Sequence, residues 1–326
     1  MIDQFGRSVE YLRVSITDKC NLRCVYCMPL EGLPWLQRDE LLSYEEIEQI
    51  VRVMAPMGLE RLRITGGEPL VRRDVPELVR LLAAVPGIRD LSLSTNAVLL
   101  AEQADALKAA GISRLNVSLD SLREDRVDRI ARRPGSYPRI MEGLAAAEEV
   151  GFSPIKINVV LIKGENDDEI QDFAEITRKH PWHVRFIEMM PTGANLDLSA
   201  QQFISCTEVL HRVREIDKLE PVPGPFGNGP AEYYQFPGAP GTIGVITPMS
   251  HNYCDRCNRM RLTADGQLRP CLFGDLQTNL RDPLRAGEDL ALHIRDTLKV
   301  KPERHYLIQG SDSGSGGLVA LSQTGG

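Results

Sequence analysis

Residues 18–29 read DKCNLRCVYCMP and place three cysteines, Cys20, Cys24 and Cys27, within eight residues. Thiols crowded in this way favour a metal centre over burial in a hydrophobic core. Cubane iron–sulfur clusters are held by cysteine thiolates and usually take four, so three thiolates leave one iron with an open coordination position. The segment therefore predicts a [4Fe–4S] cluster with a place for substrate chemistry.

Other uses of these three thiols remain open at this point. They could hold zinc, form a redox-active pair with a third thiol beside it, or form disulfides. A structural zinc site takes a fourth Cys or His, and none stands within residues 18–29. Disulfides belong to oxidising compartments, whereas the rest of the chain looks cytosolic.

The whole chain has the composition of a globular enzyme, with 326 residues, 42% of them hydrophobic and 25% charged. Its net charge of −7 argues against nucleic acid as a partner, because phosphate-rich ligands need a surplus of Lys and Arg. Residues 1–7 contain no apolar signal segment, and no run approaches the length of a membrane span. We therefore predict a cytoplasmic protein with no membrane partner.

The pattern of strands and helices predicts a parallel α/β fold. Six short β-branched or aromatic segments alternate with amphipathic ones, and the first helix begins with a capping box at Ser43 and Glu46. The predicted strands are residues 11–17, 61–65, 90–95, 114–119, 155–161 and 183–189, and the predicted helices are residues 44–55, 75–84, 101–110, 137–150 and 168–179. The turn-rich residues 220–230 predict a boundary between domains at residues 1–219 and 220–326.

A second cysteine group contains Cys254, Cys257 and Cys271. Here zinc is a serious alternative, because His251 stands three residues before Cys254 and could complete a site of three cysteines and one histidine. The seventh cysteine, Cys206, is predicted to be a buried structural thiol.

The first cysteine group, with Tyr26 just before its last cysteine, resembles the radical S-adenosylmethionine (SAM) superfamily. Residues 65–69, TGGEP, resemble the same superfamily's Gly-Gly-Glu-Pro segment, in which Gly67 permits close backbone approach. The resemblance implies that the open iron chelates SAM. It also implies a partial (βα)6 TIM-like barrel followed by a C-terminal auxiliary-cluster domain.

Further segments are similar to the MoaA family of GTP 3′,8-cyclases, which act first in molybdenum cofactor biosynthesis. They are YLRVS at 11–15, RITGGEP at 63–69, NVSLD at 116–120, KINVV at 156–160, RFIE at 185–188, the second cysteine group and the closing pair Gly325 and Gly326. The resemblance implies two [4Fe–4S] clusters, the second touching guanine, and a low-potential electron donor. It implies a radical that takes the ribose 3′ hydrogen of GTP, attack on guanine C8, and a product used by cyclic pyranopterin monophosphate synthase.

The same resemblance implies roles for individual residues. Cys20, Cys24 and Cys27 ligate the first cluster, Cys254, Cys257 and Cys271 ligate the second, and Gly325 and Gly326 assist catalysis. SAM contacts are implied for Tyr26, Gly67, Ser118 and Met190. GTP contacts are implied for Arg13, Arg63, Ser94, Lys156, Arg259, Met260 and Arg261.

The residues themselves give partial support for a polyanionic ligand. Arg13, Arg63 and Lys156 fall within predicted strands, where a charge needs an interior partner such as a triphosphate or an internal carboxylate, for instance Glu188. Two alternative functions stay open, a radical SAM peptide maturase with an auxiliary cluster and a zinc-stabilised binding scaffold without catalysis.

Overall fold

A computed structural model of the chain describes residues 1–191, 195–225, 229–305 and 321–325. The Gly- and Ser-rich residues 311–317 and the last residue, Gly326, lie outside the described residues.

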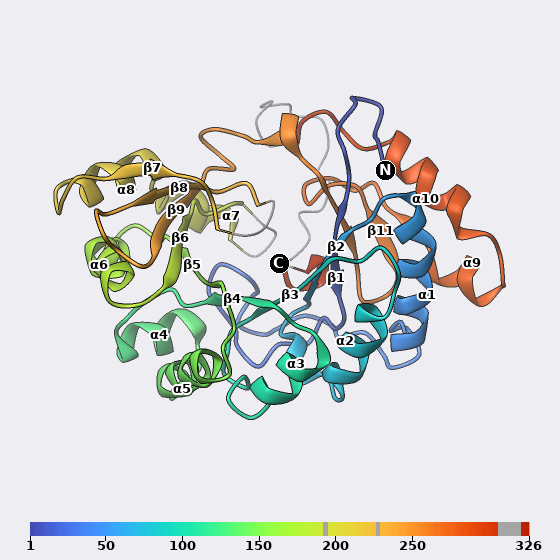
Figure 1. Cartoon of the computed structure of the whole chain (residues 1–326), viewed down its shortest axis with the longest axis horizontal. Coiled ribbons are helices and arrows are strands. Elements are labelled where there is room, and N and C mark those ends of the chain that lie inside the picture. The colour runs from blue at the N-terminus through green and yellow to red at the C-terminus, as the bar shows by residue number, and fades with distance from the viewer. Residues whose placement is uncertain (192–194, 226–228, 306–320, 326) are drawn as a thin grey trace.

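Twelve strands of the described residues form one curved sheet in the order β12-β11-β10-β1-β2-β3-β4-β5-β6-β9-β8-β7 (Figure 1). The eight central strands, from β10 to β9 in this order, are all parallel to their neighbours. The strands are β1 Tyr11–Ser15, β2 Arg61–Thr65, β3 Asp90–Thr95, β4 Arg114–Ser118, β5 Ile155–Val160, β6 Trp182–Ile187, β7 Glu220–Val222, β8 Glu232–Gln235, β9 Thr242–Ile246, β10 Arg259–Leu262, β11 Gln267–Arg269 and β12 Thr278–Asn279.

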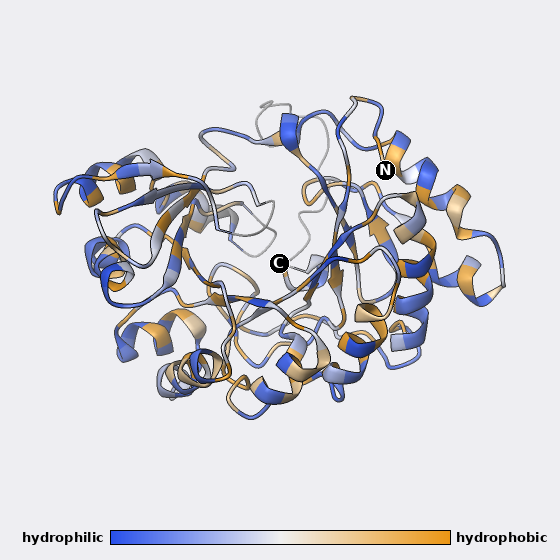
Figure 2. Ribbon diagram, viewed as in Figure 1, coloured by the Kyte–Doolittle hydropathy of each residue, from blue (hydrophilic) through white to orange (hydrophobic). Residues whose placement is uncertain are grey.

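Helices cover the convex face of this sheet (Figure 1). The helices of the described residues are α1 Tyr44–Met54, α2 Val75–Ala83, α3 Ala104–Ala110, α4 Glu124–Ala131, α5 Ser136–Glu149, α6 Ile170–Lys179, α7 Leu196–Gln201, α8 Cys206–Arg214, α9 Arg281–Arg285, α10 Leu290–Lys299 and α11 Leu321–Thr324, of which α11 lies on the concave face. The outer helices carry both hydrophobic and hydrophilic residues, as amphipathic helices do (Figure 2). The predicted capping box is confirmed, because Ser43 Oγ accepts from Glu46 N and the Glu46 side chain accepts from Ser43 N.

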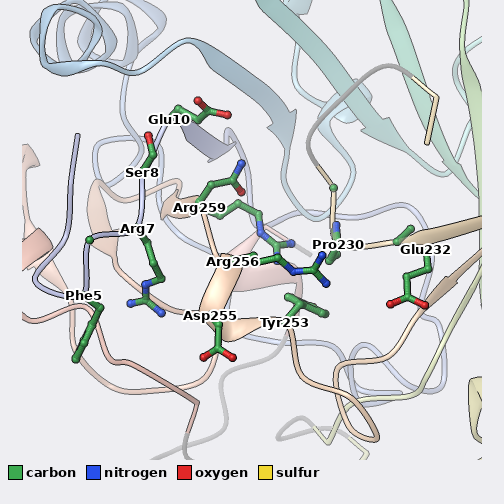
Figure 3. A pocket seen from close by; sticks show the side chains of 14 residues that line it. Phe5, Arg7, Ser8, Glu10, Pro230, Glu232, Tyr253, Asp255, Arg256 and Arg259 are labelled. Atoms are coloured by element: carbon green, nitrogen blue, oxygen red, sulfur yellow. The ribbon is translucent and has the colours of Figure 1, made fainter. Parts of the chain in front are cut away.

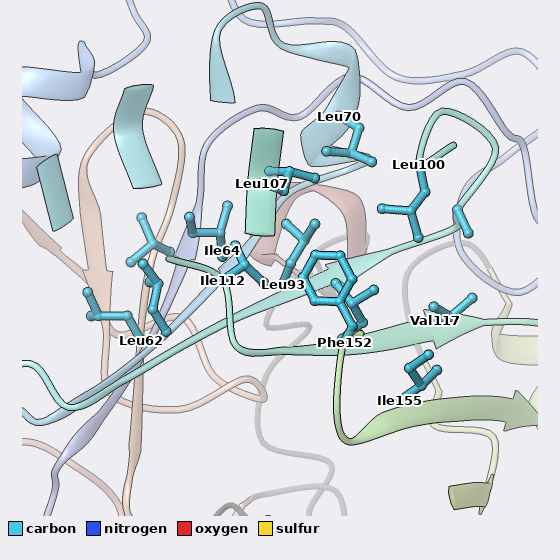
Figure 4. Packing of buried hydrophobic residues seen from close by; sticks show 14 of the residues in the cluster. Leu62, Ile64, Leu70, Leu93, Leu100, Leu107, Ile112, Val117, Phe152 and Ile155 are labelled. Atoms are coloured by element: carbon cyan, nitrogen blue, oxygen red, sulfur yellow. The ribbon is translucent and has the colours of Figure 1, made fainter. Parts of the chain in front are cut away.

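The hydrophobic core lies between the sheet and its outer helices. Leu62 and Ile64 of β2 and Leu93 of β3 are fully buried there, together with Leu107 of α3 (Figure 4). Successive strand residues point to opposite faces, so the residues between them must face the concave side.

The concave face is polar. The parallel register pairs Arg13 with Arg261 and with Arg63, Asn116 with Lys156, and Asn158 with Arg185. A closed TIM barrel fills this space with bulky aliphatic side chains. The polar residues in this open barrel instead suit a charged ligand.

The predicted fold class is confirmed, and the structure adds strands at both edges. Strand β9 pairs with β6, and β10 pairs with β1, so segments after residue 220 extend the same sheet. Alternation along one strand does not encode its partner at a sheet edge, which is why the sequence did not reveal this continuity. The domain boundary at residues 219 and 220 stays a prediction.

The helices missed in the sequence include α4 and α8. Cys206 begins α8 and is buried, as predicted for a structural thiol. Over the part of the chain that is described, no helix is both long and apolar enough to cross a bilayer.

Candidate active site

The first cysteine group lies in the loop that follows β1. Leu22 N donates to Cys20 Sγ at 3.4 Å, and Asn96 Nδ2 donates to the same sulfur at 3.9 Å. Burial raises the pKa of Cys20 to about 11 and that of Cys27 to about 12, and the thiolates disfavour one another. Neighbouring, largely desolvated thiols of this kind fit an iron–sulfur cluster, whose irons supply the positive charge that the thiolates need.

Gly67 lets the loop after β2 press against this cysteine loop. Its backbone N donates to Thr17 O at 2.7 Å, and Glu68 N donates to Lys19 O at 2.8 Å. A Cβ atom at Gly67 would stand 2.4 Å from Lys19 O and 2.6 Å from Asp18 O. The predicted need for glycine at this position is confirmed, whereas its contact with SAM stays a prediction.

The buried carboxylate of Glu68 joins this loop to the end of β3. It accepts from Asn96 N at 2.7 Å, Thr95 Oγ1 at 2.7 Å and Leu70 N at 3.0 Å. Burial raises the pKa of Glu68 to about 7 against the effect of these hydrogen bonds. Because Asn96 also contacts Cys20, Glu68 fixes a residue that touches the first thiol.

The ends of β4, β5 and β6 approach the cysteine loop from the other side. Tyr26 donates its hydroxyl to Asp120 Oδ2 at 2.7 Å, and Asp120 Oδ1 accepts from Val160 N at 2.8 Å. Asn195 Nδ2 donates to Tyr26 O at 2.8 Å and to Met190 O at 3.2 Å. Ser118 lines a small cavity together with Cys24. Tyr26, Ser118 and Met190 are therefore gathered at the first cysteine group.

The second cysteine group lines a pocket with three of the residues implied for GTP. Cys254, Cys257 and Cys271 share it with Arg259, Met260 and Arg261. His251 is exposed and does not line this pocket, so the three-cysteine, one-histidine arrangement considered for zinc is not formed with it. His305 lines the pocket instead.

A cavity of about 540 Å³ adjoins this pocket, and Tyr253 and Arg259 line both (Figure 3). Arg259 stacks on Tyr253, with its guanidinium carbon 4.9 Å from the ring centroid. Arg7 and Arg256 contribute two more guanidinium groups to the cavity wall. The cavity thus lies beside the pocket of the second cysteine group and has arginines on its wall.

The basic side chains on the concave face lower one another's pKa, because their positive charges repel. Burial lowers the pKa of Arg63 and Arg261 to about 10, and neighbouring arginines add to the effect. Burial and then Arg185, Arg114 and Arg63 lower the pKa of Lys156 to about 6. Such a group of buried cations is a site for a polyanion.

Some buried polar atoms on this face have no hydrogen-bond partner among the described residues. They include Arg13 Nε and Ser94 Oγ, both in residues implied for GTP. Glu188, considered as an internal partner for these cations, instead accepts from Met249 N at 3.1 Å and Ser250 N at 3.0 Å. It therefore positions the loop ahead of Cys254.

Arg185 was not predicted as a site residue from the sequence. This side chain is 3% exposed, and its Nη2 donates to Asn116 Oδ1 at 2.7 Å and Asn158 Oδ1 at 2.5 Å. A charged residue at a concave-facing position of a predicted strand was the available signal. The same rule that selected Arg13, Arg63 and Lys156 would have included it.

The C-terminal helix α11 and Gly325 lie on the concave face beside β1 (Figure 1). Arg261 Nη1 donates to Thr324 O and Gly325 O, both at 3.2 Å, and Thr65 Oγ1 donates to Gly325 O at 3.2 Å. Ser322 N hydrogen-bonds Cys27. The structure thus brings Gly325 among the predicted site residues, whereas Gly326 lies outside the described residues.

Comparison with known proteins places this architecture in a family. The family described as Radical SAM superfamily matches residues 14–176, and Molybdenum Cofactor Synthesis C matches residues 182–307. The GTP 3′,8-cyclase of Moorella thermoacetica is 46% identical over 329 residues, covering 100% of both chains. The GTP 3′,8-cyclase of Petrotoga mobilis is 50% identical over 308 residues, covering 94% of each chain. The chain belongs to the GTP 3′,8-cyclase family.

Membership of the GTP 3′,8-cyclase family agrees with both cysteine groups and with the predicted cofactors, two [4Fe–4S] clusters and SAM. Among solved structures, Streptococcus suis SuiB has a similar fold, with a TM-score of 0.62 and 16% identity over 89% of this chain and 68% of SuiB. At that identity the similarity concerns the radical SAM fold alone.

We expect Gly67→Ala to lower SAM cleavage about tenfold or more, because the methyl group would displace the Lys19 carbonyl and the cysteine loop. The measurement is anaerobic release of 5′-deoxyadenosine, with iron analysis of the same sample. Gly151→Ala is the control for general destabilisation. Gly151 has a φ of +79°, so alanine strains the backbone there, and the added methyl group meets no atom within 4 Å. Normal cleavage by Gly67→Ala would contradict the close approach.

Proposed function

We propose that this chain is a GTP 3′,8-cyclase, a radical SAM lyase that converts GTP to (8S)-3′,8-cyclo-7,8-dihydroguanosine 5′-triphosphate. This is the first step of molybdenum cofactor biosynthesis. The observation that carries the proposal is the row Arg261, Arg13 and Arg63 on adjacent strands. At one end of this row, Arg261 shares a pocket with the second cysteine group. At the other end, the strand of Arg63 ends at Thr65 and leads into the loop that packs against the first cysteine group.

Each cysteine group would hold a different cluster with a different function. Cys20, Cys24 and Cys27 would hold the first cluster, and Tyr26, Gly67, Ser118 and Met190 would surround SAM. Cys254, Cys257 and Cys271 would hold the second cluster, with guanine at its open iron. When bound, the first cluster and SAM would supply a 5′-deoxyadenosyl radical that takes the ribose 3′ hydrogen. The C3′ radical would then add to C8 across the C8–N7 double bond of guanine, and one electron from the reductant and one proton at N7 would complete the dihydro product.

The chain's own residues hold and orient the triphosphate. Arg13, Arg63, Lys156, Arg259 and Arg261 would contact it, and Arg185 adds positive charge to the same face. Ser94 and Met260 would complete the contacts. A polyanion relieves the repulsion among these cations, so binding energy is available to orient the ribose. On the same face, Thr324 O and Gly325 O accept hydrogen bonds from Arg261, so the tail helps to orient that guanidinium group.

Three further elements of the proposal concern partners and place. A low-potential electron donor would reduce the first cluster, cyclic pyranopterin monophosphate synthase would use the product, and the reaction would occur in the cytoplasm. The peptide-maturase alternative has the fold similarity to SuiB in its favour, but not the sequence identity.

The deciding experiment is anaerobic turnover of GTP with SAM and a reductant. We expect 5′-deoxyadenosine and a cyclised nucleotide to form together, from protein that holds about eight irons per chain. Zinc without iron would end the radical proposal, and 5′-deoxyadenosine without a cyclised nucleotide would favour another substrate.

The low pKa of Lys156 predicts that GTP binding takes up a proton. Its pKa of about 6 in the free protein should rise beside a triphosphate, so affinity should fall as pH increases above about 6. Calorimetry in buffers of different ionisation enthalpy measures this uptake. Lys156→Arg is the control, because it keeps the charge without titrating and isolates the Lys156 contribution from that of the nucleotide. Equal uptake by both proteins would contradict the prediction.

Replacing Arg261 by Ala should weaken GTP binding by roughly 1.5–3 kcal/mol, the usual scale for a charge-assisted hydrogen bond. Guanosine, which lacks the triphosphate, should lose much less affinity. Arg133→Ala is a matched control at an exposed arginine. Equal losses for GTP and guanosine would mean that Arg261 shapes the fold without binding phosphate.

Ending the chain after Thr324 should leave both clusters and GTP affinity largely intact while lowering product formation about tenfold or more. The reason is that Gly325 O accepts from Arg261 and Thr65 at the centre of the concave face. Iron content, GTP affinity and product are measured on the same preparation. Full turnover by the shortened protein would show that the last two residues have no role in catalysis.

A further inference from the structure

Lys301 is a buried lysine close to the second cysteine group. It follows α10 and is 2% exposed. A lysine is almost never fully buried without partners, because an ammonium group loses much solvation energy on leaving water. Its partners therefore decide its role.

The ammonium group of Lys301 joins the two arms of the second cysteine group. It donates to Pro270 O at 2.6 Å, next to Cys271, and to Arg259 O at 2.8 Å, two residues after Cys257. Its third contact is Cys257 Sγ at 3.6 Å. An ammonium group has three donors, and these contacts use all three. Of the three acceptors, the thiolate is the one that carries a negative charge.

The charge of Lys301 acts on Cys257 in particular. Its ammonium group lies 3.6 Å from Cys257 Sγ. Among the described hydrogen bonds, no cationic side chain donates to the sulfur of Cys254 or Cys271. Cys257 is thus distinguished from Cys254 and Cys271 by the cation placed beside it.

The segment that carries Lys301 is held in place by the N-terminal residues. Arg7 Nη1 donates to Cys254 O at 2.9 Å and Glu303 O at 2.8 Å, and Arg7 Nη2 donates to Pro302 O at 2.7 Å. Asp3 in turn accepts from Arg7 Nε at 2.6 Å. The backbone of His305 hydrogen-bonds Cys254. Residues 301–305 therefore present two hydrogen bonds to cluster thiols from a fixed position.

The first cysteine group is built differently. The described hydrogen bonds to its sulfurs come from neutral donors, among them Leu22 N and Asn96 Nδ2 on Cys20 and Ser322 N on Cys27. The nearby Arg23 donates to the carbonyl oxygens of Cys20 and Leu22 and not to a sulfur. Hydrogen bonds to cluster sulfurs and nearby charge set the reduction potential of an iron–sulfur cluster. A cation stabilises the reduced form, which carries one more electron.

We propose that Lys301 is a positioning residue of the second cluster, whose ammonium group raises that cluster's reduction potential through Cys257 and fixes the spacing of the two cysteine arms. The second cluster is then easier to reduce than the same cluster without Lys301. The inference rests on the second cluster of the proposed function, but it requires neither GTP nor turnover.

The test is a potentiometric titration of full-length reconstituted protein, followed by electron paramagnetic resonance. SAM identifies the signal of the first cluster, so the remaining signal belongs to the second. We expect Lys301→Met to lower the equilibrium constant for one-electron reduction of the second cluster about tenfold, which corresponds to about 59 mV. Lys301→Arg should restore most of this shift, and the first cluster should not change.

Lys299→Met is the matched control. Lys299 lies two residues earlier, is exposed and pairs with Asp296 at 2.7 Å. Its replacement should leave both potentials unchanged. Iron analysis of the unsubstituted protein distinguishes failure of this inference from failure of the proposed function. About eight irons per chain means that both clusters are present, whereas only four would contradict the second cluster and hence the proposed function.

Iron content also decides the case in which a variant loses the second cluster. If Lys301→Met and Lys301→Gln lose the second cluster while Lys301→Arg keeps it, the proposal is supported, because the cluster then requires a cationic donor at this position. An unchanged potential in a fully loaded Lys301→Met protein would overturn it. Loss in all three variants would also overturn it, because the position would then matter for shape and not for charge.

Discussion

Arg13 lies between two other arginines in the parallel register, Arg261 on one side and Arg63 on the other. Like charges held so close repel one another strongly, because the dielectric constant around them is lower than that of water. Arg114, on the same face, is paired with Asp90, yet its charge still helps to lower the pKa of Lys156 and of Arg63. Arg185 is held by the amides of Asn116 and Asn158, which bear no charge. The sheet and its helices hold these cations together in spite of their repulsion, and a polyanionic ligand is the partner that this arrangement favours.

The same sheet explains how two distant cysteine groups can serve one ligand. The first group follows the carboxyl end of β1, where Gly67 and Glu68 lock the loops after β1 and β2 against each other. The second group flanks β10, which pairs with β1 along four residues. Strand β1 thus connects the two groups rigidly. A displacement of β10 would change the distance between them, and the close backbone contacts at Gly67 oppose a displacement at the other end.

Much of this architecture could be predicted from sequence, because its signals are local. The spacing of Cys20, Cys24 and Cys27, the capping box at Ser43 and the alternation along each strand involve residues within a few positions of one another. Lys301 could not be found in this way, because a lysine after a helix has the pattern of a solvated surface residue and its acceptors lie at Arg259 and Pro270. The places of β9 beside β6 and of β10 beside β1 likewise depend on pairing across the whole chain.

The tail and the cations also depend on one another. Arg261 is 8% exposed, and the carbonyl oxygens of Thr324 and Gly325 accept its hydrogen bonds. These dipoles offset part of the cost of a buried guanidinium group beside Arg13, so the tail stabilises the protein before any nucleotide arrives. A triphosphate bound to Arg261 would share that side chain with the tail. Gly325 has a φ of +79° and little space beside Thr65, so the tail reaches Arg261 only in this backbone conformation. The backbone conformation of Gly325 thereby becomes part of how the tail is positioned beside Arg261.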